Sequence, residues 1–424
     1  MPDVNLSSLL NILSLSTPTL SLYLVWFNRK NIYAHLGFPL ILIAYVAPLI
    51  VFNEVYEEYQ VYQLYTKINL VGAISFFTGV LIAKIIPSIR LPFYPFYQTQ
   101  QNYHDAMYKL RSRTLFMLLF ACILMIISYI GMGFTPMFAD DPVAAKFFRG
   151  EYQETYQKVA ILFRTGNLII PVLLPLAILF IIEKFDYKLF LVVSIGIICI
   201  ALSLQRTPIG FSILTPILIY AAYKSRLIFH MIFFAYIFVY IFGAAFWWLL
   251  GITYNEADIS SFLKGAMAGT PDVPDQLGFL SGFVVNNTFA YGKTFIGGLI
   301  PFGYEWNPSA YTLRIANGVN DISQISSGGL RLPVYIWGYV NFSWLGVVIV
   351  SLLSGYLSTH MILFMKKSSF LKMPFFCLNY IYATTALVFF VNFYNISIYS
   401  ITNLVFGFIF FHMIKWKLIV NKKN

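Results

Sequence analysis

Long apolar runs alternate along almost the whole chain with short connections that contain charged residues, proline and glycine. A helix needs about 20 apolar residues to cross a bilayer, and most of the runs approach that length. The runs are continuous and do not alternate between apolar and polar residues, which excludes a transmembrane β-barrel. The pattern therefore predicts an all-α polytopic integral membrane protein with about 11 transmembrane helices. We expect the spans near 6–27, 35–53, 61–83, 114–135, 159–182, 189–204, 208–222, 227–251, 334–362, 374–393 and 396–416.

The predicted spans divide the chain into three regions. Residues 1–251 hold transmembrane helices 1–8, residues 252–333 form a large loop with short interfacial or re-entrant helices, and residues 334–424 hold helices 9–11. The sixth and seventh spans are short, because the joint Gln205-Arg206-Thr207-Pro208 interrupts an apolar run. These two helices are either tilted or a re-entrant pair.

The composition is that of a membrane protein, and the distribution of charged residues predicts its orientation in the membrane. Hydrophobic residues make up 59% of the chain and charged residues 11%, whereas soluble domains contain about 25% charged residues. The formal net charge of +11 does not indicate a nucleic-acid partner, because Lys and Arg in alternate loops also set membrane topology. Most Lys and Arg fall on one side when the N-terminus is outside. We therefore expect an outside N-terminus, a cytoplasmic C-terminus and membrane lipid around the helices.

Two outer segments then remain in which to look for function. In the first, at 136–158, Val143, Phe147 and Phe148 follow a helical spacing that favours a helix in the membrane interface. The second is the large loop at 252–333. Its Gly-interrupted apolar stretch at 277–303 is of a kind that dips into a membrane, and a broken buried segment usually lines a cavity.

Residue types on the predicted outer face exclude several chemistries. All five histidines fall on the predicted cytoplasmic side, so the outer face has no His base, His-ligated zinc or Ser-His-Asp triad. The three cysteines lie inside apolar runs, which provides no disulfide framework or Cys-rich metal site. We expect neither a metal nor another cofactor.

Two arginines on the outer side are the first candidates for substrate binding. Arg164 lies about five residues into its predicted span, and a charge at that depth is costly unless it is paired or faces water. Arg206 lies in the tight joint between the two short helices, where a rigid guanidinium suits bidentate binding of a phosphate or pyrophosphate. Snorkelling to lipid phosphate is the alternative for Arg164, and contact with headgroups is the alternative for Arg206.

The large outer loop offers further candidates. Lys293 follows Tyr291-Gly292, and Arg314 and Arg331 flank a Ser-Ser-Gly-Gly element. Glu305 lies between aromatic residues, and apolar neighbours would raise its pKa toward that of a useful base. Most of the outer acids, a set that includes Asp272 and Asp275, are expected to be solvated. Aromatic residues near the outer boundary are expected to form an interfacial belt, and Trp306, within the loop, is the candidate sugar platform. The belt residues are Trp247, Trp248, Tyr335, Trp337 and Tyr339.

Three stretches resemble a known family. They are Gln205-Arg206-Thr207, the segment YGKTFIGGLIPFGYEWNP at 291–308, and GGLRLPVYIWGYVNFSWLG at 328–346 followed by GYL at 355–357. Together they resemble the Wzy-type O-antigen and capsule repeat-unit polymerases. In that family a Tyr-x-Asn-Phe-Gly pattern begins a helix, and Ser343 stands here where the glycine would be. Gly303 likewise replaces an arginine of the family's loop, and Asn307 precedes Pro308 in place of a lysine.

The resemblance implies a membrane glycosyltransferase of the GT-C type in a bacterial inner membrane, with its active site facing the periplasm. Such an enzyme transfers a growing glycan from undecaprenyl pyrophosphate to a sugar hydroxyl of a new lipid-linked repeat unit, beside a flippase and a chain-length regulator. On this hypothesis Arg206 and Arg164 bind the donor pyrophosphate, and Arg314 or Arg331 orients the second pyrophosphate or the glycan. Glu305 or Asp321 assists the hydroxyl. Lys293, Trp306 and Tyr291 complete the expected substrate-binding set.

Two other functions compete with polymerisation. An O-antigen ligase would deliver the glycan to lipid A core, but ligases of that type carry a loop histidine that is absent here. A flippase or transporter of lipid-linked sugars usually shows paired halves and ionisable groups at the middle of the bilayer. Here the two halves of the chain are unequal, and the charges lie near the outer surface.

Overall fold

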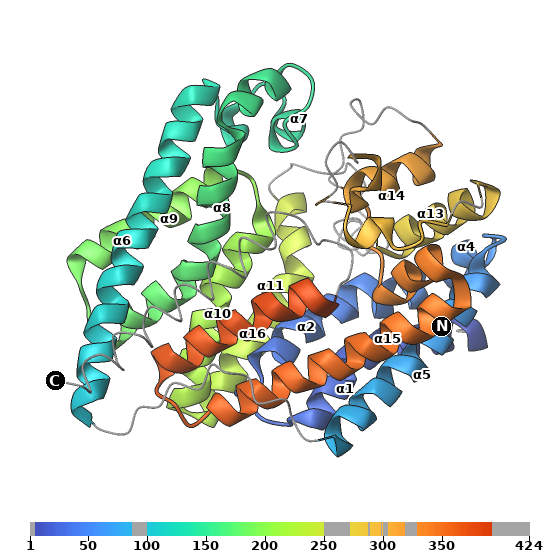
Figure 1. Ribbon diagram of the computed structural model, residues 1–424, viewed down its shortest axis with the longest axis horizontal. Helices are drawn as coiled ribbons and strands as arrows, with labels where there is room; N and C mark the ends of the chain where they lie inside the picture. Colours follow the sequence, from blue (N-terminus) through green and yellow to red (C-terminus); the bar gives the residue numbers. More distant parts are fainter. Residues whose placement is uncertain are drawn as a thin grey trace.

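The computed structural model describes residues 5–86, 100–249, 272–286, 289–297, 299, 304–318 and 329–391 (Figure 1). Every regular element within these residues is a helix, so the all-α class is confirmed for the described chain. Among the described residues, six helices are long and apolar enough to cross a membrane, in keeping with a polytopic membrane protein. They are Leu6–Val25, Ile32–Val51, Tyr62–Ile85, His104–Phe138, Tyr152–Glu183 and Val334–Ser368.

The helices follow the apolar runs closely. A helix occupies each expected span except 396–416, which lies outside the described residues. The elements of the first half are α1 (Leu6–Val25), α2 (Ile32–Ile41), the π-helical η1 (Leu42–Val46), α3 (Ala47–Val51), α4 (Asn53–Glu57), α5 (Tyr62–Ile85), α6 (Gln100–Met132), η2 (Pro136–Phe138), α7 (Pro142–Lys146), α8 (Tyr152–Glu183), α9 (Tyr187–Leu202), α10 (Arg206–Lys224) and α11 (Arg226–Leu249). Those of the second half are α13 (Asp272–Asn286), η3 (Lys293–Phe295), η4 (Tyr304–Trp306), α14 (Pro308–Asn317), α15 (Val334–Ser368) and α16 (Met373–Val391).

Glycines allow α5 and α15 to pack with their backbones in contact. A Cβ atom at Gly79 would overlap the carbonyl oxygen of Leu352, and one at Gly355 would overlap the carbonyl oxygen of Phe76. Small residues of this kind let membrane helices approach closely. Such close packing stabilises helix association in a membrane, because lipid supplies no hydrophobic drive for it. Figure 1 shows α5 and α15 running side by side next to α1.

The Lys- and Arg-rich connections meet one another at one end of the helices. Lys30 donates a hydrogen bond of 2.6 Å from Nζ to the carbonyl oxygen of Ser369, and its Nζ lies 3.8 Å from the ring centroid of Tyr223. The Tyr223 hydroxyl donates to the carbonyl oxygens of Ser369 and Leu371 at 3.0 and 2.8 Å. The connection before α2, the end of α10 and the connection after α15 are therefore joined.

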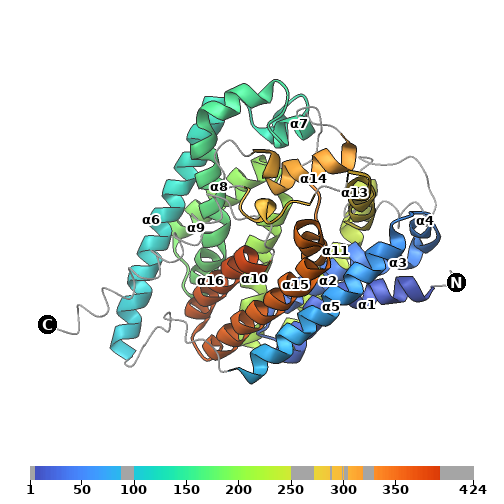
Figure 2. The same cartoon turned by 45° about the vertical axis from the view of Figure 1, so that its right-hand side comes forward.

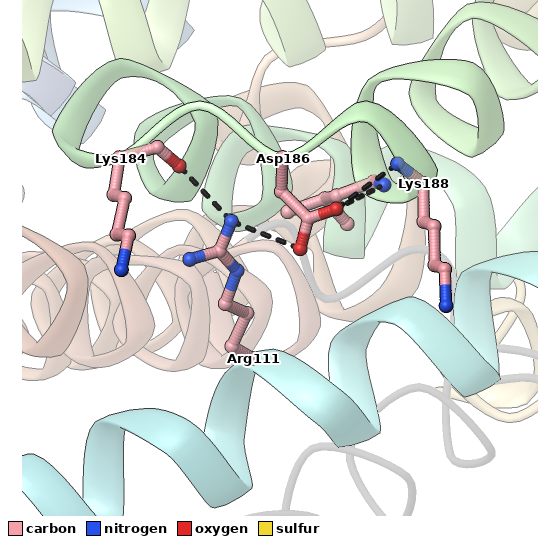
Figure 3. A network of polar contacts seen from close by, with 5 residues as sticks. Arg111, Lys184, Asp186 and Lys188 are labelled. Carbon is pink, nitrogen blue, oxygen red and sulfur yellow. Dashed lines mark hydrogen bonds and ion pairs between the residues drawn. The ribbon is translucent and has the colours of Figure 1, made fainter.

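A second cluster joins α6 to the turn between α8 and α9. Arg111 binds Oδ2 of Asp186 at 3.1 Å and donates a 3.0 Å hydrogen bond to the carbonyl oxygen of Lys184 (Figure 3). The other carboxylate oxygen of Asp186 accepts hydrogen bonds from the backbone amides of Lys188 and Leu189, and so caps the start of α9. One acid thus fixes both the start of α9 and its distance from α6.

The helix α15 is broken near its beginning. Phe342 and Ser343 have non-helical backbone angles, and Ser343 has φ 54° and ψ −147°. A Cβ atom at Gly338 would overlap backbone atoms of Gly346 and Val347, a contact between residues that a straight helix would hold about 12 Å apart. The expected continuous helix from residue 334 is therefore wrong, since a short half-helix ending at Asn341 turns sharply into the long one.

The elements of the large loop lie beside this break. In both views α7, α13 and α14 lie along the upper side of the molecule, and α13 and α14 adjoin the broken end of α15 (Figures 1 and 2). The helix α13 packs on α14 and contacts η1 and α5. Residues 277–286, expected to belong to a broken segment, form the regular second part of α13.

Candidate functional site

The elements that carry Arg164 and Arg206 are joined by a hydrogen bond. Asn167 on α8 donates from Nδ2 to Oε1 of Gln205 at 3.0 Å. Gln205 is the residue before Arg206, the first residue of α10, and Asn167 lies one helical turn after Arg164. The joint between α9 and α10 is tight, because Leu204 has a left-handed backbone with φ 57°. Arg164 and Arg206 therefore lie on neighbouring helices, each within one turn of this hydrogen bond in the sequence, and the Arg206 side chain has no described environment.

Arg164 is exposed, and Tyr156, two turns earlier on α8, binds it. Its Nε donates a 2.6 Å hydrogen bond to the hydroxyl of Tyr156, and the guanidinium carbon lies 5.5 Å from the ring centroid of Tyr156. The ring of Tyr156 stacks in turn on Phe148 at 3.7 Å with an interplanar angle of 8°. Because α7 ends at Lys146, Phe147 and Phe148 are not on the interfacial helix that the sequence predicted, and Phe148 supports Tyr156 instead.

The turn that carries Tyr291 and Lys293 closes the broken end of the half-helix. A helix that ends leaves its last carbonyl groups without amide partners. Here the amides of Ala290 and Tyr291 donate to the carbonyl oxygens of Val340 and Asn341 at 2.9 and 3.1 Å. Two of the segments that carry the family resemblance are therefore in contact, although about 50 residues separate them in the sequence.

Lys293, Trp306 and Tyr311 form a stacked group. Nζ of Lys293 lies 4.5 Å from the ring centroid of Trp306, and Trp306 stacks on Tyr311 with centroids 6.0 Å apart and an interplanar angle of 26°. Lys293 and Tyr291 are exposed, whereas Trp306 is half-buried. The ring of Trp306 is thus engaged by a cation and by a second aromatic ring.

Glu305 and Arg314 pair next to this group. Nη1 of Arg314 lies 3.6 Å from Oε2 of Glu305, and the Glu305 side chain is 56% exposed. The sequence predicted an acid enclosed by apolar neighbours at this position, and that expectation of enclosure is wrong. The neighbouring aromatic side chain, Trp306, packs on Tyr311, which leaves the carboxylate in contact with water and with an arginine.

Arg331 is bound by an acid that the sequence reasoning missed. Its Nε lies 3.1 Å from Oδ1 of Asp272, whose side chain is 6% exposed. The carbonyl oxygen of Arg331 accepts a 3.2 Å hydrogen bond from Gln276, and the hydroxyl of Tyr65 on α5 donates a 2.7 Å bond to Gln276. The expectation that Asp272 is solvated is therefore wrong, because α5 and the segment before α15 cover the first turn of α13.

Burial shifts the acids of this turn. Desolvation raises the pKa of Asp272, and the charge of Arg331 partly offsets the rise. Desolvation, followed by the charge of Asp272, raises the pKa of Asp275 to about 6. The signal available in the sequence was the position of both acids at the start of an amphipathic segment, DVPDQLGFL, whose apolar face must be covered.

Other expected site residues are placed differently or lie outside the described chain. Asp321 falls at 319–328, outside the described residues, as does the segment at 250–271. Tyr335 and Trp337 are each only 1% exposed, so these two do not belong to a lipid-facing belt. Trp247 and Trp248 have no described side-chain environment, and Tyr339 is half-buried.

The arrangement is suited to binding anions and oriented hydroxyl groups. Lys293 lies over the ring of Trp306, and Arg314 pairs with Glu305, in the region where α13 packs on α14. Within the described residues, no group of three or more His, Cys, Asp or Glu side chains is placed to hold a metal ion. Comparison of the chain with family models, with curated proteins and with solved structures gives no match.

Proposed function

We propose that this protein is a membrane glycosyltransferase that polymerises lipid-linked repeat units. It takes a growing glycan from undecaprenyl pyrophosphate and transfers it to a sugar hydroxyl of a new lipid-linked unit. The proposed fold has 11 spans, an outside N-terminus and a periplasmic active site in a bacterial inner membrane. A flippase and a chain-length regulator are the proposed partners, and no metal takes part.

The contacts among basic connections support the proposed orientation. Lys30 touches the connection after α15, and Arg111 touches the connection before α9. All of these connections are on the cytoplasmic side in the topology inferred from the distribution of Lys and Arg. The elements α7, α13 and α14 then belong to the outer side, together with the candidate site (Figure 2).

The single observation that carries the proposal is the hydrogen bond between Asn167 and Gln205. It aligns the two helices that bear Arg164 and Arg206. In the reaction the bond between the anomeric carbon and the pyrophosphate oxygen breaks, and the electron pair and its charge pass to the pyrophosphate. The acceptor hydroxyl oxygen forms the new bond to the anomeric carbon, and its proton passes to the proposed base, Glu305 or Asp321. Cations aimed at that developing charge are the principal means of catalysis for such a leaving group. We assign Arg164 and Arg206 this role, and the outer-loop residues the binding of the second lipid-linked unit.

The backbone of Ser343 agrees with the proposed family. Its φ of 54° with ψ of −147° belongs to a region that only glycine adopts without strain. The family pattern has glycine at this place, directly after the Asn-Phe pair. Asn341 and Phe342 stand there in this chain, and Asn341 makes the contacts that close the break. A conformation that favours glycine at the family's glycine position supports the resemblance.

A gel assay with purified protein in lipid tests the proposal. The substrate is a single undecaprenyl pyrophosphate-linked repeat unit, with EDTA present, and the variants are Arg206→Ala, Arg206→Lys and Arg164→Ala. We expect a ladder of regularly spaced products from the wild type and none from the two alanine variants. Full polymerisation by Arg206→Lys would remove bidentate binding from the proposal. Movement of the unit across vesicles, or onto lipid A core, without a ladder would replace the polymerase with a flippase or a ligase.

A further inference from the structure

Asn341 is a buried polar residue at the point where α15 breaks. Its side chain is 0% exposed and every hydrogen-bonding position of its amide is used. Oδ1 accepts from the amide of Gly292 at 2.9 Å and from the hydroxyl of Thr294 at 3.0 Å. Nδ2 donates to Oγ1 of Thr294 at 2.8 Å and to the carbonyl oxygen of Trp337 at 2.9 Å. One side chain therefore ties the half-helix to the turn.

The turn needs this support because its backbone is strained. Tyr291 has φ 48° and Gly292 has φ 81°, so two consecutive residues adopt left-handed conformations. A left-handed conformation strains a non-glycine residue, and it persists only when its surroundings enforce it. The amides of Ala290, Tyr291 and Gly292 all bond to Val340 or Asn341, which provides that enforcement.

The turn presents two exposed groups of the proposed substrate-binding set. Lys293 directly follows the strained pair, and its amide donates to the carbonyl oxygen of Ala290 at 2.9 Å. Its Nζ lies 4.5 Å from the ring centroid of Trp306. A lysine ammonium fixed at one place is a point charge that suits a phosphate oxygen. Tyr291 supplies an exposed hydroxyl beside it.

We propose that Asn341 is a positioning residue, which sets the turn so that Lys293 binds the diphosphate of a lipid-linked substrate. This inference rests on the proposed function, because it names a determinant of the same site. Asn341 does not touch the ligand and acts through the Gly292 amide and through Thr294. Its loss leaves the charge of Lys293 intact but removes the constraint on where that charge lies.

Amide hydrogen exchange tests the first half of the proposal. The full-length protein is reconstituted in phosphatidylcholine nanodiscs as wild type, Asn341→Ala, Thr294→Val and Asn69→Ala. Asn69 is a matched control, since it is equally buried but bonds to Asn11 in the seam between α5 and α1. We expect faster exchange at 289–295 in Asn341→Ala and Thr294→Val, and unchanged exchange there in Asn69→Ala. Unchanged exchange in Asn341→Ala, or equally faster exchange in Asn69→Ala, would overturn the proposal.

Binding of geranylgeranyl diphosphate to the same nanodiscs tests the second half. We expect Lys293→Ala and Asn341→Ala each to weaken binding about tenfold, the loss of one charge-assisted contact. The double variant should bind within about twofold of Lys293→Ala, because both changes remove the same contact. Additive losses would overturn the proposal, since Asn341 would then act independently of Lys293. Weakening by Asn69→Ala to the same extent would overturn it as well, as a general effect of destabilisation.

Anionic headgroups are the other source of the same phosphate chemistry. Two competition experiments distinguish an anionic headgroup from a substrate diphosphate. One uses nanodiscs that contain phosphatidylglycerol, and the other adds soluble inorganic pyrophosphate as the competitor. If pyrophosphate displaces geranylgeranyl diphosphate and phosphatidylglycerol does not, the result supports a substrate diphosphate. Displacement of the probe by phosphatidylglycerol overturns that assignment. If the wild type makes no polymer but the binding results hold, polymerisation fails while the role of Asn341 stands.

Discussion

Asn167 on α8 and Gln205 before α10 are joined through their side-chain amides at 3.0 Å. This bond links two segments that are 38 residues apart in the sequence. It fixes the register between the helix of Arg164 and the first turn of the helix that begins at Arg206. A pair of cations that must bind one pyrophosphate requires such a fixed register, because catalysis is sensitive to displacements of about 1 Å.

Replacing Asn167 with alanine should therefore slow polymer formation more than it destabilises the protein. We expect the initial rate of ladder formation to fall about tenfold or more, with a loss of about 1 kcal/mol in the free energy of unfolding. Ser194→Ala is the control, since the hydroxyl of Ser194 donates within its own helix to the carbonyl oxygen of Phe190. A variant of Asn167 with the rate of the wild type would show that the register of α8 and α10 is irrelevant to the reaction.

Ser343→Gly should stabilise the protein, because glycine adopts the backbone conformation of this position without strain. The expected gain in the free energy of unfolding is about 1 kcal/mol, measured by thermal unfolding in nanodiscs. Ser351→Gly is the matched control within the regular part of α15, where glycine should destabilise by about 1 kcal/mol. Equal effects of the two changes would mean that residue 343 carries no strain.

Asp275→Asn should raise stability at neutral pH and leave it unchanged in acid. Desolvation and the neighbouring charge of Asp272 raise the pKa of Asp275 to about 6, from 3.8. Its ionised form is thus disfavoured in the folded state, and its destabilising effect is complete above about pH 6 and absent below about pH 4. Because this side chain is only half-buried, we expect a gain on the order of 1 kcal/mol at pH 7 to 8.

The measurement for Asp275 is the unfolding temperature of the variant and the wild type between pH 4 and pH 8. The two curves should converge as the pH falls through this range. Glu154→Gln is the control, since Glu154 is exposed and pairs with Lys158 on the same helix. A constant difference between the curves at all pH values would rule out the titration of Asp275 as its cause.

Gly79→Ala and Gly355→Ala should destabilise the seam between α5 and α15. The added methyl group would meet the carbonyl oxygen of Leu352 in the first case and that of Phe76 in the second. Overpacking of this kind costs about 2 kcal/mol. Gly278→Ala on α13 is the control, because a Cβ atom there meets nothing within 4 Å. The expectation is measured by thermal unfolding, and it is refuted if all three variants unfold alike.

Labelling of single cysteines tests the proposed topology. Lys188→Cys, beside the Arg111 cluster of Figure 3, should react with a membrane-impermeant maleimide only in opened vesicles. Lys158→Cys, on the first turns of α8, should react in intact cells. The three natural cysteines are buried, so they provide a low background. Reaction of both positions from the same side would contradict the proposed path of α8 through the membrane.

The sequence predicted the positions of the helices well, because bilayer thickness alone sets how long an apolar run must be. The span expected at 61–83 is the helix Tyr62–Ile85, for example. It did not predict the break at Phe342 and Ser343, since the local sequence is continuous and contains no proline. The break depends on amides at 290 and 291, which the sequence does not connect with residue 341.

The same limit applies to the candidate site. Tyr291, Lys293 and Trp306 were identified from residue type, and the structure brings Lys293 and Trp306 together. The environments of the acids were predicted wrongly for a physical reason. Neighbours in sequence decide little about burial in a folded loop, so Glu305 is exposed and Asp272 is enclosed by distant segments.

The closure of the half-helix by the turn has a consequence for engineering the protein. The turn cannot be exchanged for that of a related chain without leaving the carbonyl groups of Val340 and Asn341 unpaired near the membrane, where each unpaired group costs several kcal/mol. Residues 289–295 and 334–346 therefore form one exchangeable module, split in sequence but single in structure. A chimera that alters this part of the protein should transplant both pieces together.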